Sequence, residues 1–486
     1  MARGGATEQA ARTQFREVFA VGEFRALWLA QLLSVVGDQL ARVALTVLVY
    51  DRTRSALLAA ITFVVSIVPT FIGGLTLAWL ADRYPRRAVM IASDVARCAL
   101  VLVMAIPGLP LAALVVLLFM VTLIGAPFSS ARAAIFPDVL SGDRYVIGTA
   151  VTVTTYQFAQ VIGFALGGTL VGFFGTRTSL IIDAASFAGS ALIVRAWVHV
   201  RPAAAADLHH GSSRVAGVFT GARLVLARPA LRTPILFGLL AAFYNAPEGV
   251  AAPLARAFGG GAAAVGVILA ANALGQTVGT IAFSRFVAPA TRLRFMGPLA
   301  SSACGVLVLF LFRPDLYLSL LILIASGLCA SYQLAANSAF VSAAPPEQRS
   351  QAFGLAQGAM SLGQGVVMIL AGAAAEHHAP AQAIAVCGAI GLAVALALTV
   401  GAARDRGWRL SKRQHRALNQ VQLFSRMAGS FLGGRGGWCG RGSGPAVLAH
   451  GGILPRGGAG DGEISAGGKR TRQNISLCTR INPLSN

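Results

Sequence analysis

Long apolar stretches dominate this chain and limit what it can fold into. Runs of roughly 20 mostly apolar residues, long enough for a helix to cross a bilayer, alternate with short polar or Pro/Gly segments. Only 12% of the 486 residues are charged, about half the share in a soluble domain. The twelve runs lie near Phe24–Tyr50, Ala56–Ala81, Ala88–Ile106, Leu111–Ala131, Ile147–Phe174, Ser179–Val200, Thr233–Leu254, Ala262–Phe286, Phe295–Phe312, Leu316–Val341, Ala352–Ala375 and Ala379–Ala403. We therefore expect an all-α integral membrane protein with twelve transmembrane helices.

Arginines in the loops between these runs predict the orientation. One set of alternate loops holds fourteen arginines and the other set holds five. Because basic loops stay in the cytoplasm, the first set and both termini are expected there. The N-terminus lacks a short apolar region followed by a small-residue cleavage site, so we expect no cleaved signal peptide. The interpretation is a multi-pass protein of the cell (inner or plasma) membrane.

A long polar segment after the sixth run divides the membrane part. We expect a cytoplasmic segment at 1–23, a six-helix bundle at 24–200, a cytoplasmic loop at 201–232 and a second bundle at 233–403. A weak repeat at an offset of 205 supports two pseudo-symmetric bundles. It relates Ala131, Ala134, Arg144 and Gly167 to Ala336, Ala339, Arg349 and Gly372.

Residues 404–486 form a Gly-rich, basic tail. This segment contains fourteen basic and three acidic residues, which is half of the chain's net charge of +22. Such a composition buries too little apolar surface to fold, so we expect disorder. An RNA-binding tail would need aromatic residues among the arginines, and Phe424, Phe431 and Trp438 are few. We expect contact with anionic lipid and no nucleic-acid partner.

The loop Ala78–Arg87 contains the most informative motif. Asp82 follows the end of a helix, where the negative end of the helix dipole disfavours a carboxylate. It needs stabilisation from Arg83, Arg86 and Arg87 or from the N-terminus of another helix. A contact of this kind between two bundles would hold one conformation, so we interpret the motif as a conformational gate. The alternative is a solvated loop carboxylate.

This loop resembles the signature of the major facilitator superfamily, G-x-L-A-D-R-x-G-R-R. Ala78 and Pro85 replace the two glycines, and the remaining positions match. With Phe24–Trp28 and the pair Gly37-Asp38, the chain looks like the branch that contains macrolide-efflux proteins and the enterobactin exporter. The resemblance implies two six-helix bundles, alternating access and a central cavity.

Two further motifs of this family are imperfect here. The antiporter motif G-x-x-x-G-P-x-x-G-G falls on Ala159–Gly168 and retains Gly163, Gly167 and Gly168. These glycines would allow close helix crossing, which packing alone would also explain. An arginine that many proton-coupled antiporters have in span four is missing, because Leu111–Pro127 is uncharged. Export by proton exchange is therefore expected from the resemblance alone.

Ionisable residues inside the spans are candidate sites, because a charge at mid-bilayer costs roughly 2.5–3.5 kcal/mol. Asp38 is the first candidate for a protonatable carboxylate, and the alternative is an i,i+4 pair with Arg42. Glu248 is the second, beside a helix break expected at Pro247 and Gly249. Asp94 and Arg97 are expected to pair and to extend the Asp82 network. Asp183, near the outer end of span six, ranks below Asp38 and Glu248, because it could simply be hydrated.

Neutral polar residues at helical spacing complete the candidate cavity lining. Each could instead form an interhelical hydrogen bond. As a set they suit a bulky amphipathic solute better than a sugar or a phosphate ester. The set is Tyr156, Gln157, Gln160, Asn245, Asn272, Gln276, Gln333, Asn337, Gln357 and Gln364.

These features predict a secondary active transporter that exports an amphipathic small molecule, such as a drug-like compound or a siderophore, by proton antiport. Lysophospholipid translocation is the alternative within transport, and a polytopic membrane enzyme is a remote one. No ATP-binding G-x-x-x-x-G-K-[ST] loop occurs, and the six cysteines lack metal-ligand spacing. We expect no cofactor, no metal and no catalytic residue, with a small-molecule substrate, the proton and the bilayer as partners of a monomer.

Overall fold

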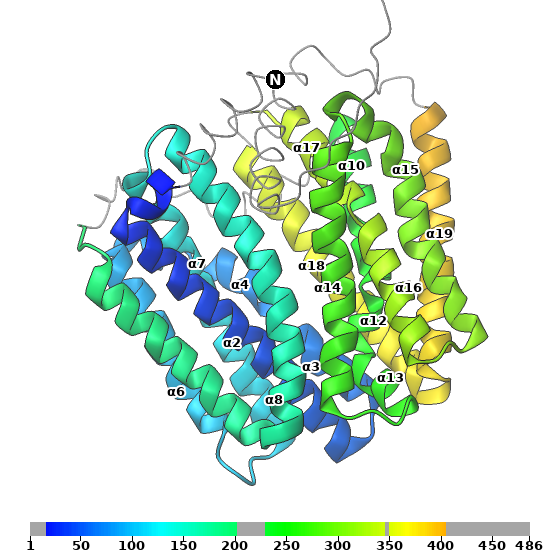
Figure 1. The fold of residues 1–486 in the computed structure, drawn as a ribbon, viewed down its shortest axis with the longest axis horizontal. Coiled ribbons are helices and arrows are strands. Elements are labelled where there is room, and N and C mark those ends of the chain that lie inside the picture. Colours follow the sequence, from blue (N-terminus) through cyan, green and yellow to red (C-terminus); the bar gives the residue numbers. More distant parts are fainter. Residues whose placement is uncertain (1–15, 202–228, 346–348, 405–486) are drawn as a thin grey trace, which may run out of the picture. The chain divides into compact units, whose positions relative to one another are not determined.

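The computed structural model describes residues 16–201, 229–345 and 349–404. All of them lie in the unit Met1–Gly434. The tail 405–486 and most of the loop expected at 201–232 fall outside the described residues. Within the described ranges, all regular secondary structure is helical (Figure 1). The all-α fold predicted from the apolar runs is confirmed.

The helices follow the predicted spans closely. We call the helices of residues 22–197 the first half and those of residues 229–404 the second half. The first half contains α2 (Gly22–Thr53), α3 (Ala56–Val65), α4 (Val68–Thr76), α5 (Leu80–Arg83), α6 (Arg86–Met104), α7 (Leu111–Val139) and α8 (Asp143–Trp197). The second half contains α10 (Pro229–Leu239), α11 (Ala241–Tyr244), α12 (Ala246–Gly249), α13 (Ala251–Ala257), α14 (Ala262–Phe286), α15 (Pro289–Gly305), the 3-10 helix η1 (Val306–Phe312), α16 (Leu316–Cys329), α17 (Tyr332–Ala343), α18 (Arg349–His377) and α19 (Pro380–Arg404).

Helix α8 contains two spans. Its 55 residues would extend over roughly 80 Å as one straight helix, far more than the ~30 Å core of a bilayer. The helix breaks at Gly175, whose φ of 75° and ψ of 170° are accessible to glycine and unfavourable for other residues. The first arm (143–174) and the second arm (176–197) run antiparallel beside α2 (Figure 1).

The count of spans agrees with the prediction once the breaks are considered. Nine of the described helices are long and apolar enough to cross a membrane, and a tenth span is the pair Ala230–Gly249 and Ala251–Ala257, bent by 44°. The second arm of α8 is the eleventh. Helix α6 is the twelfth, and its four charged residues explain why composition alone does not select it. The break expected near Pro247 and Gly249 is confirmed.

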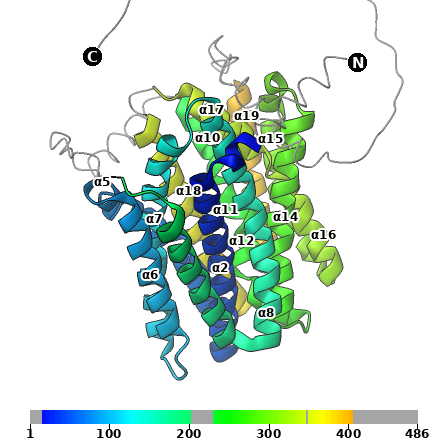
Figure 2. The ribbon, with the colours of Figure 1, turned by 60° about the vertical axis from the view of Figure 1, so that its left-hand side comes forward.

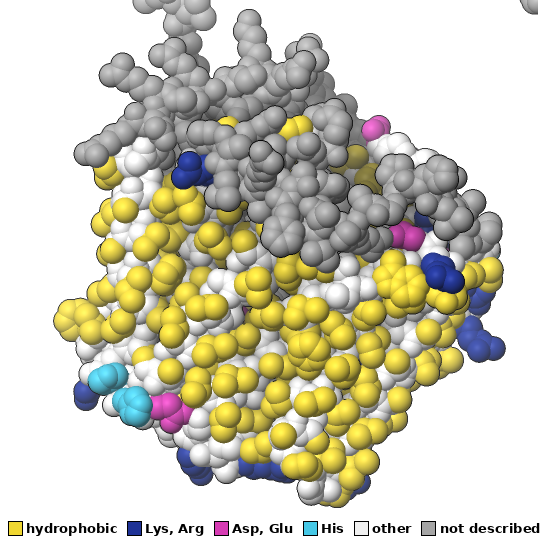
Figure 3. Space-filling model, turned by 180° about the vertical axis from the view of Figure 1, so that it is seen from behind, with side chains coloured by type: hydrophobic (Ala, Val, Ile, Leu, Met, Phe, Trp, Pro, Cys, Tyr) yellow, Lys and Arg dark blue, Asp and Glu magenta, His cyan; other side chains and the backbone are white. Residues whose placement is uncertain are grey.

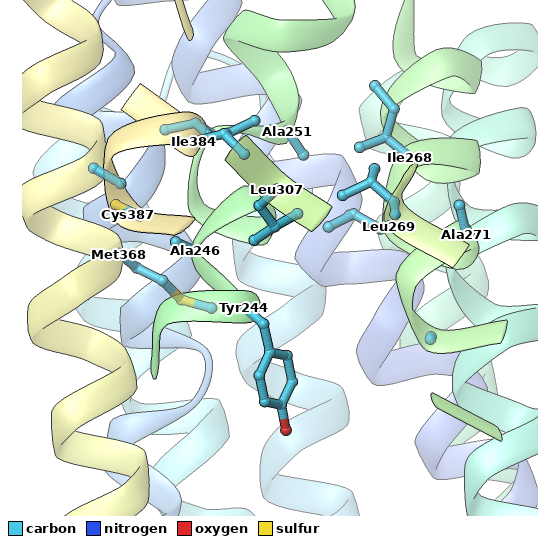
Figure 4. Close-up of a cluster of buried hydrophobic side chains, with 14 of the residues drawn as sticks. Tyr244, Ala246, Ala251, Ile268, Leu269, Ala271, Leu307, Met368, Ile384 and Cys387 are labelled. Carbon is cyan, nitrogen blue, oxygen red and sulfur yellow. The ribbon is translucent and has the colours of Figure 1, made fainter. Parts of the chain in front are cut away.

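Small and aliphatic side chains make the main core of the second half. Figure 4 shows Met368 of α18 beside Ala246 of the broken span, with Ile384 and Cys387 nearby and the Tyr244 ring pointing away from Met368. Ala246 and Ala251 are fully buried, and their small size lets the short helices approach their neighbours closely. The broken span is therefore held by packing on both sides.

The outer surface is suited to lipid. Figure 3 shows a broad face of apolar side chains, with charged and histidine side chains gathered at its edges. Large side chains such as Phe173, Phe286 and Phe312 are each at least 80% exposed. An apolar surface of this extent is unfavourable in water and favourable in a bilayer.

Candidate functional site

A central cavity of about 610 Å³ lies between the two halves. Helices α2, α4 and the first arm of α8 form one wall, and α12, α14 and α18 form the other. Apolar and aromatic groups alternate with amides and two charged groups along its surface. The lining residues are Arg42, Ser66, Ile67, Thr70, Phe71, Gly74, Leu75, Tyr156, Gln157, Gln160, Asn245, Glu248, Ala273, Gln276, Phe353, Gly354, Gln357, Ser361 and Gln364. Eight of the residues singled out from the sequence therefore meet here.

The broken span places a polar cluster on the second-half wall. Asn245 Oδ1 accepts hydrogen bonds from Asn272 Nδ2 at 3.0 Å and from Gln276 Nε2 at 3.1 Å. Asn272 Nδ2 also approaches Glu248 Oε1 at 3.4 Å. Asn272 is buried behind the wall, so it positions its neighbours and does not line the cavity. The break at Pro247 thus brings one carboxylate and three amides together.

Arg42 carries the positive charge of the first-half wall. Its Nη2 donates to the carbonyl oxygen of Ser66 at 3.0 Å, and its guanidinium lies 5.5 Å from the centre of the Phe63 ring. The Ser66 carbonyl is available because α3 ends at Val65 and α4 begins at Val68. Arg42 and Glu248 are close enough to interact electrostatically. The sequence offered Arg42 only as a partner for Asp38.

A second cavity of about 360 Å³ lies inside the first half. Arg42, Ser66, Thr70 and Tyr156 line both cavities, so the two are neighbours. The second cavity also exposes Asp38, Arg97 and Arg132. Arg132 was counted as a loop residue, but α7 continues to Val139 and its guanidinium hydrogen-bonds to Gln31. The helix of span four therefore carries an arginine after all, beyond the predicted end of the span.

A buried ionic cluster lies beside the second cavity. Arg97 forms an ion pair with Asp38, donates to Ser34 Oγ at 3.1 Å and lies 3.8 Å from Asp94 Oδ1. Its guanidinium also covers the Phe187 ring at 4.0 Å. The i,i+4 pair of Asp38 with Arg42 is thus not the arrangement found. Helices α6 and α2 both pack against α8, and the long side chain of Arg97 reaches Asp38 from α6.

The surroundings of Asp94 and Asp183 differ from those predicted from the sequence. Asp94 is fully buried and accepts a hydrogen bond from Ser190 Oγ at 2.5 Å, so its contacts lead into the helix bundle and not to the Asp82 loop. Asp183 is also fully buried, so it is not hydrated as expected. Its Oδ1 lies where a Cβ on residue 37 would be, and Gly37 leaves that space free.

Gln333 and Asn337 line a third cavity, of about 230 Å³, within the second half. Gln333 Nε2 donates to the carbonyl of Gly238 and to Tyr244 Oη, both at 3.1 Å. Phe353 and Gln357 line this cavity as well as the central one. Gln333 and Asn337 therefore do not line the central cavity as predicted; they lie behind its second-half wall.

The arginines of the Asp82 loop hold the first half together. Arg86 donates to the Ala134 carbonyl and to Asp138 Oδ2, both at 2.8 Å, which ties α6 to the end of α7. Arg87 bonds the carbonyl of Arg195 on α8, and Arg83 lies over the Trp79 ring at 5.9 Å. Figure 2 shows α5 at the ends of α6 and α7. Asp82 itself takes part in an interaction.

The three glycines of the antiporter-like motif lie at helix crossings. Gly163 and Gly167 face α2, where a Cβ would meet Gln39 at 2.8 Å and Leu40 at 3.0 Å. Gly168 faces the second half instead, and its Cβ would come within 2.6 Å of the backbone of Gly266 on α14. The motif thus packs the first arm of α8 within its own half and across the two halves.

Two sets of hydrogen bonds between described residues join the halves at one end of the bundle. We call it the Thr53 end, after the last residue of α2. Arg256 Nη2 bonds both carboxylate oxygens of Asp51 at 2.7 Å. Glu376 accepts from Ser55 Oγ and from the Leu57 backbone N–H at 2.8 Å. These contacts hold the Thr53 end closed.

In the described ranges, no group of three or more His, Cys, Asp or Glu side chains is arranged to hold a metal ion. The charged groups that line the cavities are the Asp38–Arg97 pair, Arg42, Arg132 and Glu248. The side chains on the cavity walls can form hydrogen bonds and attract opposite charges.

Comparison with known proteins agrees with this architecture. A family model described as the Major Facilitator Superfamily matches residues 27–249 and 248–449. No curated protein matches the chain significantly.

Solved structures of transporters have a similar fold. A bacterial homologue of the human lysosomal transporter Spinster, inward-facing and occupied, aligns with a TM-score of 0.57 and 16% identity over 83% of this chain and 96% of that one. A mutant of the nucleoside transporter NupG aligns with a TM-score of 0.58 and 16% identity over 77% of this chain and 98% of that one. A POT family transporter in complex with a thioalcohol-conjugated peptide aligns with a TM-score of 0.61 and 11% identity over 78% of this chain and 96% of that one. At these identities the likeness concerns the fold alone.

Proposed function

The chain belongs to the major facilitator superfamily of membrane transporters, and from this membership we propose that it exports an amphipathic small molecule by proton antiport. The observation that carries the proposal is the central cavity of about 610 Å³ between the halves. Its walls combine aromatic and aliphatic groups with amides, which suits a solute with an apolar body and a few polar groups. A drug-like compound or a siderophore, as in the macrolide-efflux and enterobactin-exporter branch, has this character.

Two carboxylates are the proposed proton-binding groups. Glu248 lines the central cavity on the second half, and Asp38 faces the second cavity on the first half. Asp38 has a side chain 34% exposed to that cavity, so water can deliver a proton to it. Carboxylates in membrane spans that line cavities typically serve ion or proton transfer.

The closed Thr53 end fits one state of an alternating-access cycle. If the arginine bias of the loops sets the orientation, that end faces the outside, and closure there belongs to the part of the cycle in which the cavity opens to the cytoplasm. Breaking the Asp51–Arg256 and Glu376 contacts, and forming others at the opposite end, would then release the solute outside. In the state that releases the solute outside, the conformational gate at Asp82 would close the cytoplasmic end.

A transport screen tests the proposal. Accumulation of amphipathic dyes, antibiotics, siderophores and a lysophospholipid is measured in a host without its own exporters, with and without an uncoupler. We expect lower accumulation of at least one amphipathic compound, lost on uncoupling. Asp38→Asn and Glu248→Gln should each abolish this export, whereas Asp315→Asn, an exposed helix-capping substitution, should not.

Three outcomes would contradict the proposal. Export that survives the uncoupler would exclude the proton gradient as the driving force. Preference for a small hydrophilic anion would exclude the amphipathic class. Transfer of the lysophospholipid alone would favour the lipid translocator.

A further inference from the structure

Arg97 is surrounded by more carboxylates than it can neutralise. It forms its ion pair with Asp38 on α2, lies 3.8 Å from Asp94 on its own helix, and is within electrostatic range of Asp183 on the second arm of α8. Asp94 and Asp183 are fully buried, and Arg97 is only 4% exposed. Because an uncompensated charge is strongly disfavoured inside a membrane protein, this set of groups must share protons and partners.

Two oxygens in this cluster have unused hydrogen-bonding capacity. Within the described part of the chain, Asp94 Oδ1 and Asp183 Oδ2 are buried and make no hydrogen bond. The remaining Asp183 oxygen, Oδ1, lies against Gly37, the residue before Asp38, because glycine leaves the position of a Cβ empty. Asp183 is therefore held beside the Asp38 backbone without being bonded to the Asp38 carboxylate.

We propose that Asp94 and Asp183 are alternative ion-pair partners of Arg97, and that they neutralise its guanidinium when Asp38 binds a proton. With Asp38 ionised, the ion pair described above joins α6 to α2. Protonation of the Asp38 carboxylate makes it a neutral carboxyl and removes its attraction for Arg97. The guanidinium then joins α6 to the second arm of α8. Asp183 is a positioning residue in this exchange, and the inference rests on the proposed proton coupling.

The surroundings favour these two acids over any other group. The other titratable or charged side chains that face Asp38 or Asp183 are Arg42 on α2, Cys98 on α6, Arg132 on α7 and Tyr156 on the first arm of α8. None of them is a carboxylate, and α3 and α4 contribute no charged side chain to the second cavity. The proton itself enters and leaves through that cavity, to which Asp38 is exposed.

The exchange would transmit proton binding to helix packing. Arg97 already lies over the Phe187 ring of the second arm, and Asp94 already accepts from Ser190 on the same arm. A small rotation of the guanidinium away from Asp38 therefore strengthens contacts that exist and releases only α2. Proton binding would loosen α2 from α6 while keeping α6 and α8 together.

A melting experiment on purified full-length protein tests the shared partner without any transport assay. Asp38→Asn, Asp183→Asn and the double variant are compared at one pH. If Arg97 has alternative partners, the shift of the double variant exceeds the sum of the single shifts, by about 3 °C or more. The matched control pairs Asp183→Asn with Asp51→Asn, which lies on α2 but pairs with Arg256, and is expected to be additive.

Additive shifts for Asp38 and Asp183 would overturn the proposal. Loss of expression in the double variant alone, with both single variants and the control pair folded, would support it as an extreme form of the same effect. The pH profile of export gives a second readout. Asp183→Asn should shift the profile and Asp183→Glu should restore it, and an unshifted profile in Asp183→Asn would overturn the proposal.

The melting experiment and the export assay separate this inference from the proposed function. Absence of proton-driven export of any amphipathic compound, together with non-additive melting, would remove the proposed function and keep the shared partner of Arg97. Intact export with additive melting would remove the shared partner and keep the function.

Discussion

Replacement of Gly168 by alanine should open the Thr53 end of the bundle. A Cβ at this position would lie 2.6 Å from the carbonyl oxygen of Ala262, 2.6 Å from Gly266 Cα and 2.8 Å from Gly266 N. All three are backbone atoms, so no side-chain rotation can relieve the contact. Restoring an ordinary separation would move α8 and α14 apart by nearly an ångström.

The expected magnitude follows from the cost of overpacking. One added methyl group in a close-packed site costs about 1–3 kcal/mol. Alanine also favours the helix by up to about 1 kcal/mol, but that gain is the same in both conformations and cancels from the equilibrium between them. A net cost of about 2 kcal/mol on the closed Thr53 end shifts the two conformations by roughly 30-fold.

Gly172 provides a matched control on the same helix, one turn further along. A Cβ there would lie 3.7 Å from the nearest atom, the backbone nitrogen of Ala263, which is an ordinary contact. Spin labels at Ile106 and Tyr317, both exposed and near the Thr53 end, report the separation of the halves by pulsed electron resonance. The six native cysteines are replaced first.

We expect a long-distance population to appear in Gly168→Ala and the distribution in Gly172→Ala to match the parent protein. If the two variants gave the same distribution, the close approach of α8 and α14 would not control the Thr53 end. A Gly168→Ala protein that stayed closed but melted at a lower temperature would show that the crossing stabilises both conformations equally.

Three further predictions concern polar contacts. Asp51→Ala and Arg256→Ala should each favour opening of the Thr53 end, with a coupling energy of only about 0.5–1 kcal/mol in a double-mutant cycle, because the pair is partly exposed; a larger coupling would show that the pair is desolvated. Asn245→Ala should lower stability by about 1–3 kcal/mol, because it leaves two amide donors without their acceptor; thermal melting measures it, and an unchanged midpoint would refute it. Arg86→Gln should loosen α6 from α7 at Asp138 and raise the rate of amide hydrogen exchange there. Arg313→Gln, which removes an exposed charge, should leave that rate unchanged.

Much of the fold could be predicted from the sequence because lipid imposes a simple rule. A span must be long and apolar, so twelve runs gave twelve spans, and Pro247 with Gly249 marked the break in the seventh. The break at Ser66 was missed, although Pro69 in the first turn of α4 is a signal that a new helix begins there. The end of α7 was placed too early, because Arg132 was taken as a loop signal although a helix can continue past an arginine.

The candidate site was harder to predict because its partners lie on different helices. From the sequence, Arg42 was the obvious partner of Asp38, four residues along one helix. Arg97 is 59 residues away, and only the packing of α2 and α6 against α8 brings it to Asp38. Asp183 posed the same difficulty, since nothing in its own span shows that Gly37 leaves room for it. By contrast, Glu248 and the amides around it were found because a helix break concentrates polar groups locally.

The distribution of charge between the halves limits how the proposed proton and solute could influence each other. Asp38 and its ionic cluster lie within the first half, whereas Glu248 and the amides of the broken span belong to the second. Arg42 and Tyr156 are the groups with a charge or a titratable hydroxyl that line both cavities. Arg42 is anchored on the break between α3 and α4, so the side chain that lines both cavities also holds a helix terminus. In the proposed mechanism, a solute in the central cavity and a proton on Asp38 would therefore both lie near the same arginine.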